Sequence, residues 1–183
     1  SFNVQKNILY NGVAEVKNGL FSVSFIVPYD IAFNFGKGRI SYYARNDEMD
    51  ANGLFENVII GGISSDAEVD NTPPQITLHM NDEEFRNGGL TGPNPVLLAK
   101  LYDESGINSS GNGIGHDLTA VLDGETSTAY ILNDFYLADK GTYKSGSLSY
   151  QLYNLAEGDH TLKVTAWDVF NNSASKAISF KVG

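Results

Sequence analysis

Apolar and polar residues alternate in two segments at the C-terminal end of the chain. Every second residue is apolar in 162–166 and again in 178–182, and the polar stretch 168–173 (DVFNNS) separates the two segments. A period of two is typical of a strand with one buried face. Asp and Asn side chains bond to nearby backbone and favour turns. The pattern therefore predicts a closing β-hairpin over residues 160–182, as in an immunoglobulin-like sandwich.

Short alternating segments also fill the first 65 residues. The segment 21–27 (FSVSFIV) alternates and ends at Pro28, which has no N–H for a strand ladder. A second strand is predicted at 39–44 (RISYYA), a polar loop at 46–53 and a short apolar strand at 58–60. These amount to about four or five strands, fewer than the roughly seven of a complete immunoglobulin-like sandwich.

An acidic segment that ends in two prolines, 64–74 (SSDAEVDNTPP), predicts a domain boundary, because proline excludes helix and favours an extended linker. Beyond it the pattern predicts about eight strands and no amphipathic helix. We therefore predict an all-β protein. Residues 1–70 form a small, truncated β-domain and residues 71–183 form an immunoglobulin-like β-sandwich.

Charge and composition exclude several function classes. The chain has 12 Lys and Arg against 22 Asp and Glu, a formal charge of −10, and both halves are acidic. A groove that follows a phosphate backbone needs the opposite charge, so nucleic acid is not an expected partner. With no cysteine, the chain holds no disulfide, thiolate metal site or cysteine nucleophile. No apolar run is long enough to predict a transmembrane segment.

The glycine-rich segment 103–115 (DESGINSSGNGIG) carries the acidic residues that suggest a metal site. Asp103 and Glu104 open it and Asp117 follows it, so these carboxylates are candidate ligands. Ca²⁺ takes six to eight oxygen ligands and suits flexible acidic loops, whereas no other cofactor is predicted. The spacing matches no EF-hand, however. The alternative is that these residues are solvated turn formers.

The histidines give little support for catalysis. His116 lies near several serines in sequence, but the Gly-x-Ser-x-Gly pattern of a nucleophile elbow is absent. A histidine base also needs a nucleophile and an orienting partner within reach. We therefore expect His116 to have a turn or hydrogen-bonding role, and we predict no catalytic residue in this chain. His79 is expected to face away from the core of its sheet, and His160 begins the closing hairpin.

Aromatic residues are the candidates for an interaction surface. Trp167 falls on the strand phase opposite to the apolar residues 162–166, so a loop or a neighbouring domain is expected to cover it. Aromatic side chains bury a large area with few torsions, which suits sugar rings or protein partners. Alternatively, these rings anchor the irregular segment 133–153 onto the sandwich. The interaction candidates are Trp167, Phe135, Tyr136 and Tyr143.

Several segments together resemble one protein family. They are FIVPYDI (25–31), GKGRISYYA (36–44), NTPPQITLHMND (71–82), LYDESGINSSGNGIGHDLTAVLDG (101–124), LNDFYLADKGTYKSG (132–146) and HTLKVTAWDVFNNS (160–173). They are similar to the C-terminal β-domain region of the PorU family. Its members are gingipain-type cysteine peptidases and sortases of the type IX secretion system of Bacteroidetes. The similarity extends over essentially the whole chain.

The resemblance implies a longer parent protein at the outer-membrane surface. An upstream catalytic domain there would cleave C-terminal secretion signals and attach cargo to the cell surface. The present chain would be a non-catalytic accessory region that spaces or docks that domain, with outer-membrane secretion components as further partners. A carbohydrate-binding module, resting on the aromatic candidates, and a calcium-stabilised adhesin-like domain are the alternatives. We expect the chain to be a piece of a longer protein, since it has no initiator Met and no signal peptide.

Overall fold

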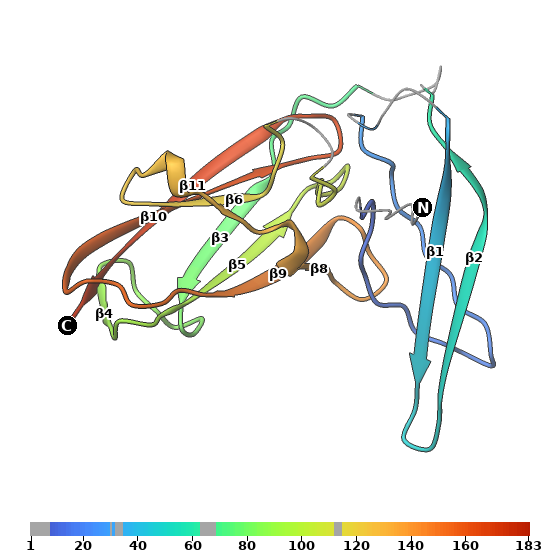
Figure 1. Ribbon diagram of the computed structural model, residues 1–183, viewed down its shortest axis with the longest axis horizontal. Helices are drawn as coiled ribbons and strands as arrows, with labels where there is room; N and C mark the ends of the chain where they lie inside the picture. The colour runs from blue at the N-terminus through green and yellow to red at the C-terminus, as the bar shows by residue number, and fades with distance from the viewer. Residues whose placement is uncertain (1–7, 30, 32–34, 63–68, 112–114) are drawn as a thin grey trace, which may run out of the picture.

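A computed structural model describes residues 8–29, 31, 35–62, 69–111 and 115–183 (Figure 1). Its described elements are strands and two short 3-10 helices, η1 (Thr126–Thr128) and η2 (Asn133–Phe135). The prediction of an all-β fold is therefore confirmed. Residues 64–68 of the predicted boundary lie outside the described residues, and the division at residue 70 stays a prediction. In the described part of the chain, no helix has the length and apolar character needed to cross a bilayer.

The N-terminal sheet is a single hairpin. Strand β1 (Gly36–Arg45) pairs antiparallel with β2 (Asp50–Ile60), and neither has a second neighbour among the described strands. The predicted loop over 46–53 is wrong beyond residue 49, because β2 already begins at Asp50. The reason is a tight turn: the Asn46 side-chain oxygen accepts hydrogen bonds from the N–H groups of Glu48 and Met49.

The second part of the chain is a sandwich of two sheets. One has the order β3-β5-β9-β8, formed by Gln75–Met80, Val96–Tyr102, Ser145–Gln151 and Tyr136–Ala138. The other has the order β4-β11-β10-β6-β7, formed by Gly89–Thr91, Ser173–Val182, Gly158–Trp167, Thr119–Leu122 and Tyr130–Ile131. β4 pairs parallel with β11, and the other pairings in these two sheets are antiparallel.

The core lies between these two sheets and explains the alternation in the sequence. The predicted closing hairpin is present as β10 and β11, which pair along their whole length. Their inward residues are buried against the inward residues of the opposite sheet, since successive side chains of a strand point to opposite faces. The largest fully buried side chains include Phe180, Leu162 and Val164 from the hairpin and Met80, Leu97 and Leu101 from β3 and β5.

The predicted strand over residues 21–27 is not formed. The described chain offers this segment no neighbouring strand, so its ladder hydrogen bonds have no partner, although its apolar residues alternate. Part of the segment 8–29 instead lies between the hairpin and the sandwich, and part of it crosses the hairpin (Figure 1). The Tyr10 ring stacks on Phe25 at 4.9 Å, and Phe21 packs edge-on against Tyr42 of β1.

Backbone hydrogen bonds fasten this N-terminal segment to the sandwich. The Ala138 N–H donates to the Asn11 carbonyl at 3.1 Å, beside β8. The Tyr29 N–H donates to the Val169 carbonyl at 2.8 Å, at the turn between β10 and β11. The hairpin is therefore connected to one end of the sandwich through residues 8–29.

Candidate metal centre

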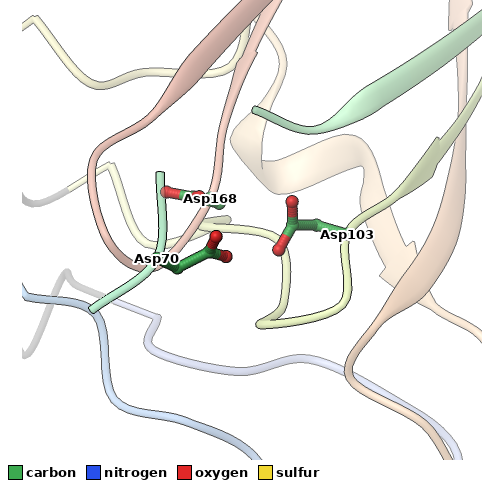
Figure 2. Close-up of side chains that lie close together, drawn as sticks. All are labelled: Asp70, Asp103 and Asp168. Atoms are coloured by element: carbon green, nitrogen blue, oxygen red, sulfur yellow. The ribbon is translucent and has the colours of Figure 1, made fainter. Parts of the chain in front are cut away.

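Three aspartates meet at the end of the sandwich nearest the N-terminal segment (Figure 2). Asp70 precedes β3, Asp103 directly follows β5 and Asp168 directly follows β10. One carboxylate oxygen from each lies within 4.8 Å of the others. Asp103 is 3% exposed and Asp168 is fully buried. The fold therefore brings together side chains that stand far apart in the sequence.

Each carboxylate is held by local hydrogen bonds that shape its turn. Oδ1 of Asp103 accepts the N–H groups of Ser105 and Gly106, and Oδ1 of Asp168 accepts that of Asn172 at 2.7 Å. Asp70 is tied to the other two loops. Its Oδ2 accepts the Ser105 hydroxyl at 2.5 Å, and its backbone carbonyl accepts the Asn172 side-chain amide at 3.0 Å.

The electrostatics of the three groups differ. Burial raises the pKa of Asp103, and the charges of Asp168 and Asp70 raise it further. Burial likewise raises the pKa of Asp168, with a contribution from Asp70. The hydrogen bond from Ser105 lowers the pKa of Asp70. The charged forms of Asp103 and Asp168 are thus destabilised, because both carboxylates are removed from water and lie near other negative charges.

The three carboxylates offer oxygen ligands of the kind that a hard cation prefers. None of the ion pairs among the described residues involves these carboxylates, and none of the described hydrogen bonds reaches Oδ2 of Asp103. Ca²⁺ prefers carboxylate and carbonyl oxygens and tolerates irregular geometry. These residues could hold such an ion, whose charge would offset the mutual repulsion.

The predicted ligand set and this group share only Asp103. Glu104 is exposed, where it pairs with Lys144 and accepts the Tyr102 hydroxyl at 2.6 Å. Asp117 lies outside the group, and burial raises its pKa. The sequence analysis missed Asp70 and Asp168, since Asp70 lies in the predicted linker 64–74, Asp168 lies in the predicted turn 168–173, and no fixed spacing links either of them to Asp103.

The aromatic candidates occupy separate places. Trp167 is half-buried, and its ring lies 4.3 Å from that of His116. Tyr136 is 3% exposed, so its ring is not available to a ligand. Phe135 is 48% exposed and packs edge-on against Tyr150, whereas Tyr143 is half-buried beside Gly106. Among the described residues, no ring contact joins these four candidates to one another.

His160 has a structural role with a clear dependence on protonation. Its Nδ1 lies 2.7 Å from Oδ2 of Asp123, and its Nε2 lies 2.8 Å from the carbonyl oxygen of Ala156. Both neighbours are acceptors, so both nitrogens donate only when the ring is doubly protonated. The hydrogen bond to Ala156, followed by the one to Asp123, raises the pKa of His160.

We predict that this histidine makes stability depend on pH. A raised pKa in the folded state means that the contribution is complete below the ordinary value of 6.5 and is lost as pH rises through the folded value. As pH rises above about 6.5, the free energy of unfolding should therefore fall more in the natural chain than in His160→Gln. Urea titrations of both proteins across this range measure the difference. Parallel pH profiles would contradict the assignment.

The chain is similar to one region of a known protein. A crystal structure of dimeric latent PorU from Porphyromonas gingivalis matches 97% of this chain with 40% sequence identity and a TM-score of 0.59. The match spans 17% of that protein's length, so most of PorU lies outside it.

Other comparisons add little. An endo-β-1,4-mannanase from Thermotoga petrophila matches 58% of this chain and 20% of its own, at 12% identity and a TM-score of 0.39, too low to support an argument. No protein-family model and no curated protein matches the chain. The identity and the extent of the PorU match agree with the family resemblance of the sequence motifs. Over nearly its whole length, this chain is therefore a homologue of one region of PorU.

Proposed function

We propose that this chain is a non-catalytic accessory region of a cell-surface, PorU-type sortase-like peptidase of the type IX secretion system. Its work is to dock and orient the catalytic domain of the same protein, and the β1–β2 hairpin is the docking element. The similarity to PorU supports a peptidase as the parent. The lack of any cysteine agrees with a supporting role for a region of a cysteine peptidase.

The observation that carries this proposal is the apolar surface of the hairpin. No residue of β1 or β2 is buried. Cross-strand partners share a face of the sheet, which places Ile40 with Phe55 on one face. Tyr43, Leu54 and Ile59 lie on the other face, because β2 carries an extra residue between Phe55 and Val58. These five side chains are 39% to 71% exposed, and contiguous exposed apolar surface marks interaction sites.

The backbone of the hairpin offers a second means of docking. β1 and β2 pair only with each other among the described strands, so each has one edge of unpaired N–H and C=O groups. Such edges can pair with strands of another domain. A partner that contacts the apolar faces and extends the sheet would satisfy both features. Since the matched PorU is a dimer, a second copy is the other candidate occupant.

Binding between separately produced parts tests this proposal. The present chain is titrated with the catalytic domain of its PorU-type parent by calorimetry, and sedimentation of the chain alone measures self-association. Saturable binding to the catalytic domain supports the proposal. Self-association without such binding would assign the hairpin to a second copy, and the absence of both would overturn the docking role.

We further propose that the aspartate group formed by Asp70, Asp103 and Asp168 binds Ca²⁺ and stabilises the junction between the N-terminal segment and the sandwich. Two observations favour this role. The carboxylates converge within 4.8 Å without a described cationic partner. Asp70 also belongs to the stretch that leads from the hairpin into β3, so an ion shared with Asp103 and Asp168 would hold that stretch in place.

We predict that added Ca²⁺ raises the unfolding midpoint of this chain and that a chelator reverses the rise. A ligand that binds only the folded state stabilises it by about 2.7 kcal/mol at a concentration one hundred times its dissociation constant. Thermal unfolding with millimolar Ca²⁺ or with chelator measures the effect. Asp103→Asn should abolish the response and Asp134→Asn, on an exposed residue, should keep it. An unchanged midpoint in the natural chain would refute calcium binding.

A further inference from the structure

A groove of about 340 Å³ lies across the outer face of the β3-β5-β9-β8 sheet. Two cross-strand rows form it. Gln75, Tyr102 and Ser145 are aligned in one row, and Thr77, Lys100 and Ser147 in the other. Asp139, which directly follows β8, also lines the groove. We call this surface the sheet-face groove. Its volume lies within the range of small-molecule sites.

Three of the side chains that line the groove have polar partners nearby. The Tyr102 hydroxyl donates to Glu104, Lys100 pairs with Glu83 at 2.8 Å, and the Ser145 hydroxyl donates to Asp139 at 2.6 Å. Groups that are already fixed lose little freedom when a ligand binds. The groove therefore presents an ordered surface.

Three other residues that line the groove have polar side chains with no described hydrogen-bond partner. None of the described hydrogen bonds uses the side chain of Gln75, Thr77 or Ser147. All three residues are exposed. Hydroxyl and amide groups both donate and accept, so they match a ligand that carries many hydroxyl groups. Tyr102, which is 42% exposed, adds an aromatic face beside them.

The charges favour a neutral ligand. Lys100 is paired with Glu83, and Asp139 and Glu104 lie at the groove or beside it, so an anion would meet repulsion. The dimensions favour a chain of rings. Adjacent strands lie about 4.8 Å apart, and three strands therefore span roughly 10 Å, close to the length of two or three linked sugar rings.

We propose that the sheet-face groove binds a neutral oligosaccharide, with hydrogen bonds from the side chains of Gln75, Thr77 and Ser147 and with a sugar ring packed on Tyr102. This site is separate from the hairpin and from the aspartate group, and it does not depend on the docking role. Besides the proposed docking and calcium binding, the chain would then recognise a glycan at low affinity.

Amide chemical shifts provide the test. The ¹⁵N-labelled chain is titrated with cellotriose, mannotriose and maltotriose at millimolar concentration. At least one trisaccharide is expected to shift the amides of 75–77, 100–102 and 145–147. Tyr102→Ala should weaken binding at least about tenfold. Ser147→Tyr, which fills the groove from an exposed position, should block binding if Tyr102→Ala does not fold. Tyr153→Ala, on a tyrosine that does not line the groove, should bind normally.

Two results would overturn the proposal. If none of the three trisaccharides shifts these amides in the natural chain, the sheet-face groove is not an oligosaccharide site. Binding that Ser147→Tyr and Tyr102→Ala both leave intact would also reject the proposal, since the sugar would then lie elsewhere.

Discussion

Replacing Phe180 by alanine is expected to lower the free energy of unfolding by about 3–5 kcal/mol. Phe180 is 2% exposed and lies near the end of β11, where its register partners are His160 of β10 and Gly89 of β4. Its ring contributes to the core between the two sheets. Removing the ring loses burial of apolar area and leaves a cavity that the surrounding strands cannot fill. Since domains are stable by only about 5–15 kcal/mol, this is a large fraction of the total.

Urea unfolding monitored by circular dichroism measures this loss, and Phe135→Ala is the matched control. Phe135 is 48% exposed and packs against Tyr150, so its truncation should lower stability by about 1 kcal/mol. Equal losses in the two variants would show that β11 does not contribute to a shared core in the way that the fold requires.

The second large effect is expected at the hairpin. Leu54→Ser combined with Ile59→Ser, on one face of the hairpin, should weaken binding to the catalytic domain at least about tenfold, because apolar anchors at the centre of an interface contribute about 2 kcal/mol or more each. Ile40→Ser combined with Phe55→Ser tests the opposite face. All four residues are exposed, so the isolated chain should keep its stability within about 0.5 kcal/mol for each substitution.

Calorimetric titration of the two double variants measures the change. Leu90→Ser is the control, because Leu90 is 68% exposed but belongs to β4 of the sandwich. If the hairpin variants bind as tightly as the natural chain while Leu90→Ser does not, the docking surface lies on the sandwich and the proposed role of the hairpin fails.

Strands with one buried face were predictable from the sequence. The alternation at 162–166 and 178–182 corresponds to buried positions in β10 and β11, because both segments contribute one face to the same core. The segment 21–27 also alternates, except at Ile26, but it forms no paired strand. Alternation reports how side chains would divide between two faces, whereas pairing depends on a neighbour that a local pattern cannot reveal.

The aspartate group was only partly predictable for a related reason. Asp103 stood out because it opens a glycine-rich segment. Asp70 and Asp168 meet it only after three strand ends converge at one end of the sandwich. Asp70 lies in the predicted linker and Asp168 in the predicted turn, and each side chain accepts a hydrogen bond from the backbone of its own loop. The sheet-face groove could not be predicted from the sequence either, because its rows depend on the register of β3, β5 and β9.

Hydrogen–deuterium exchange of the hairpin tests the docking role most directly. Exchange is measured for peptides covering β1 and β2 in this chain alone and in the complete PorU-type protein. Docking that covers the hairpin and pairs its free edges predicts slower exchange of these peptides in the complete protein, with unchanged exchange for the buried residues of β11. Equal exchange of β1 and β2 in the two proteins would contradict the proposal that the hairpin docks this region onto its catalytic domain.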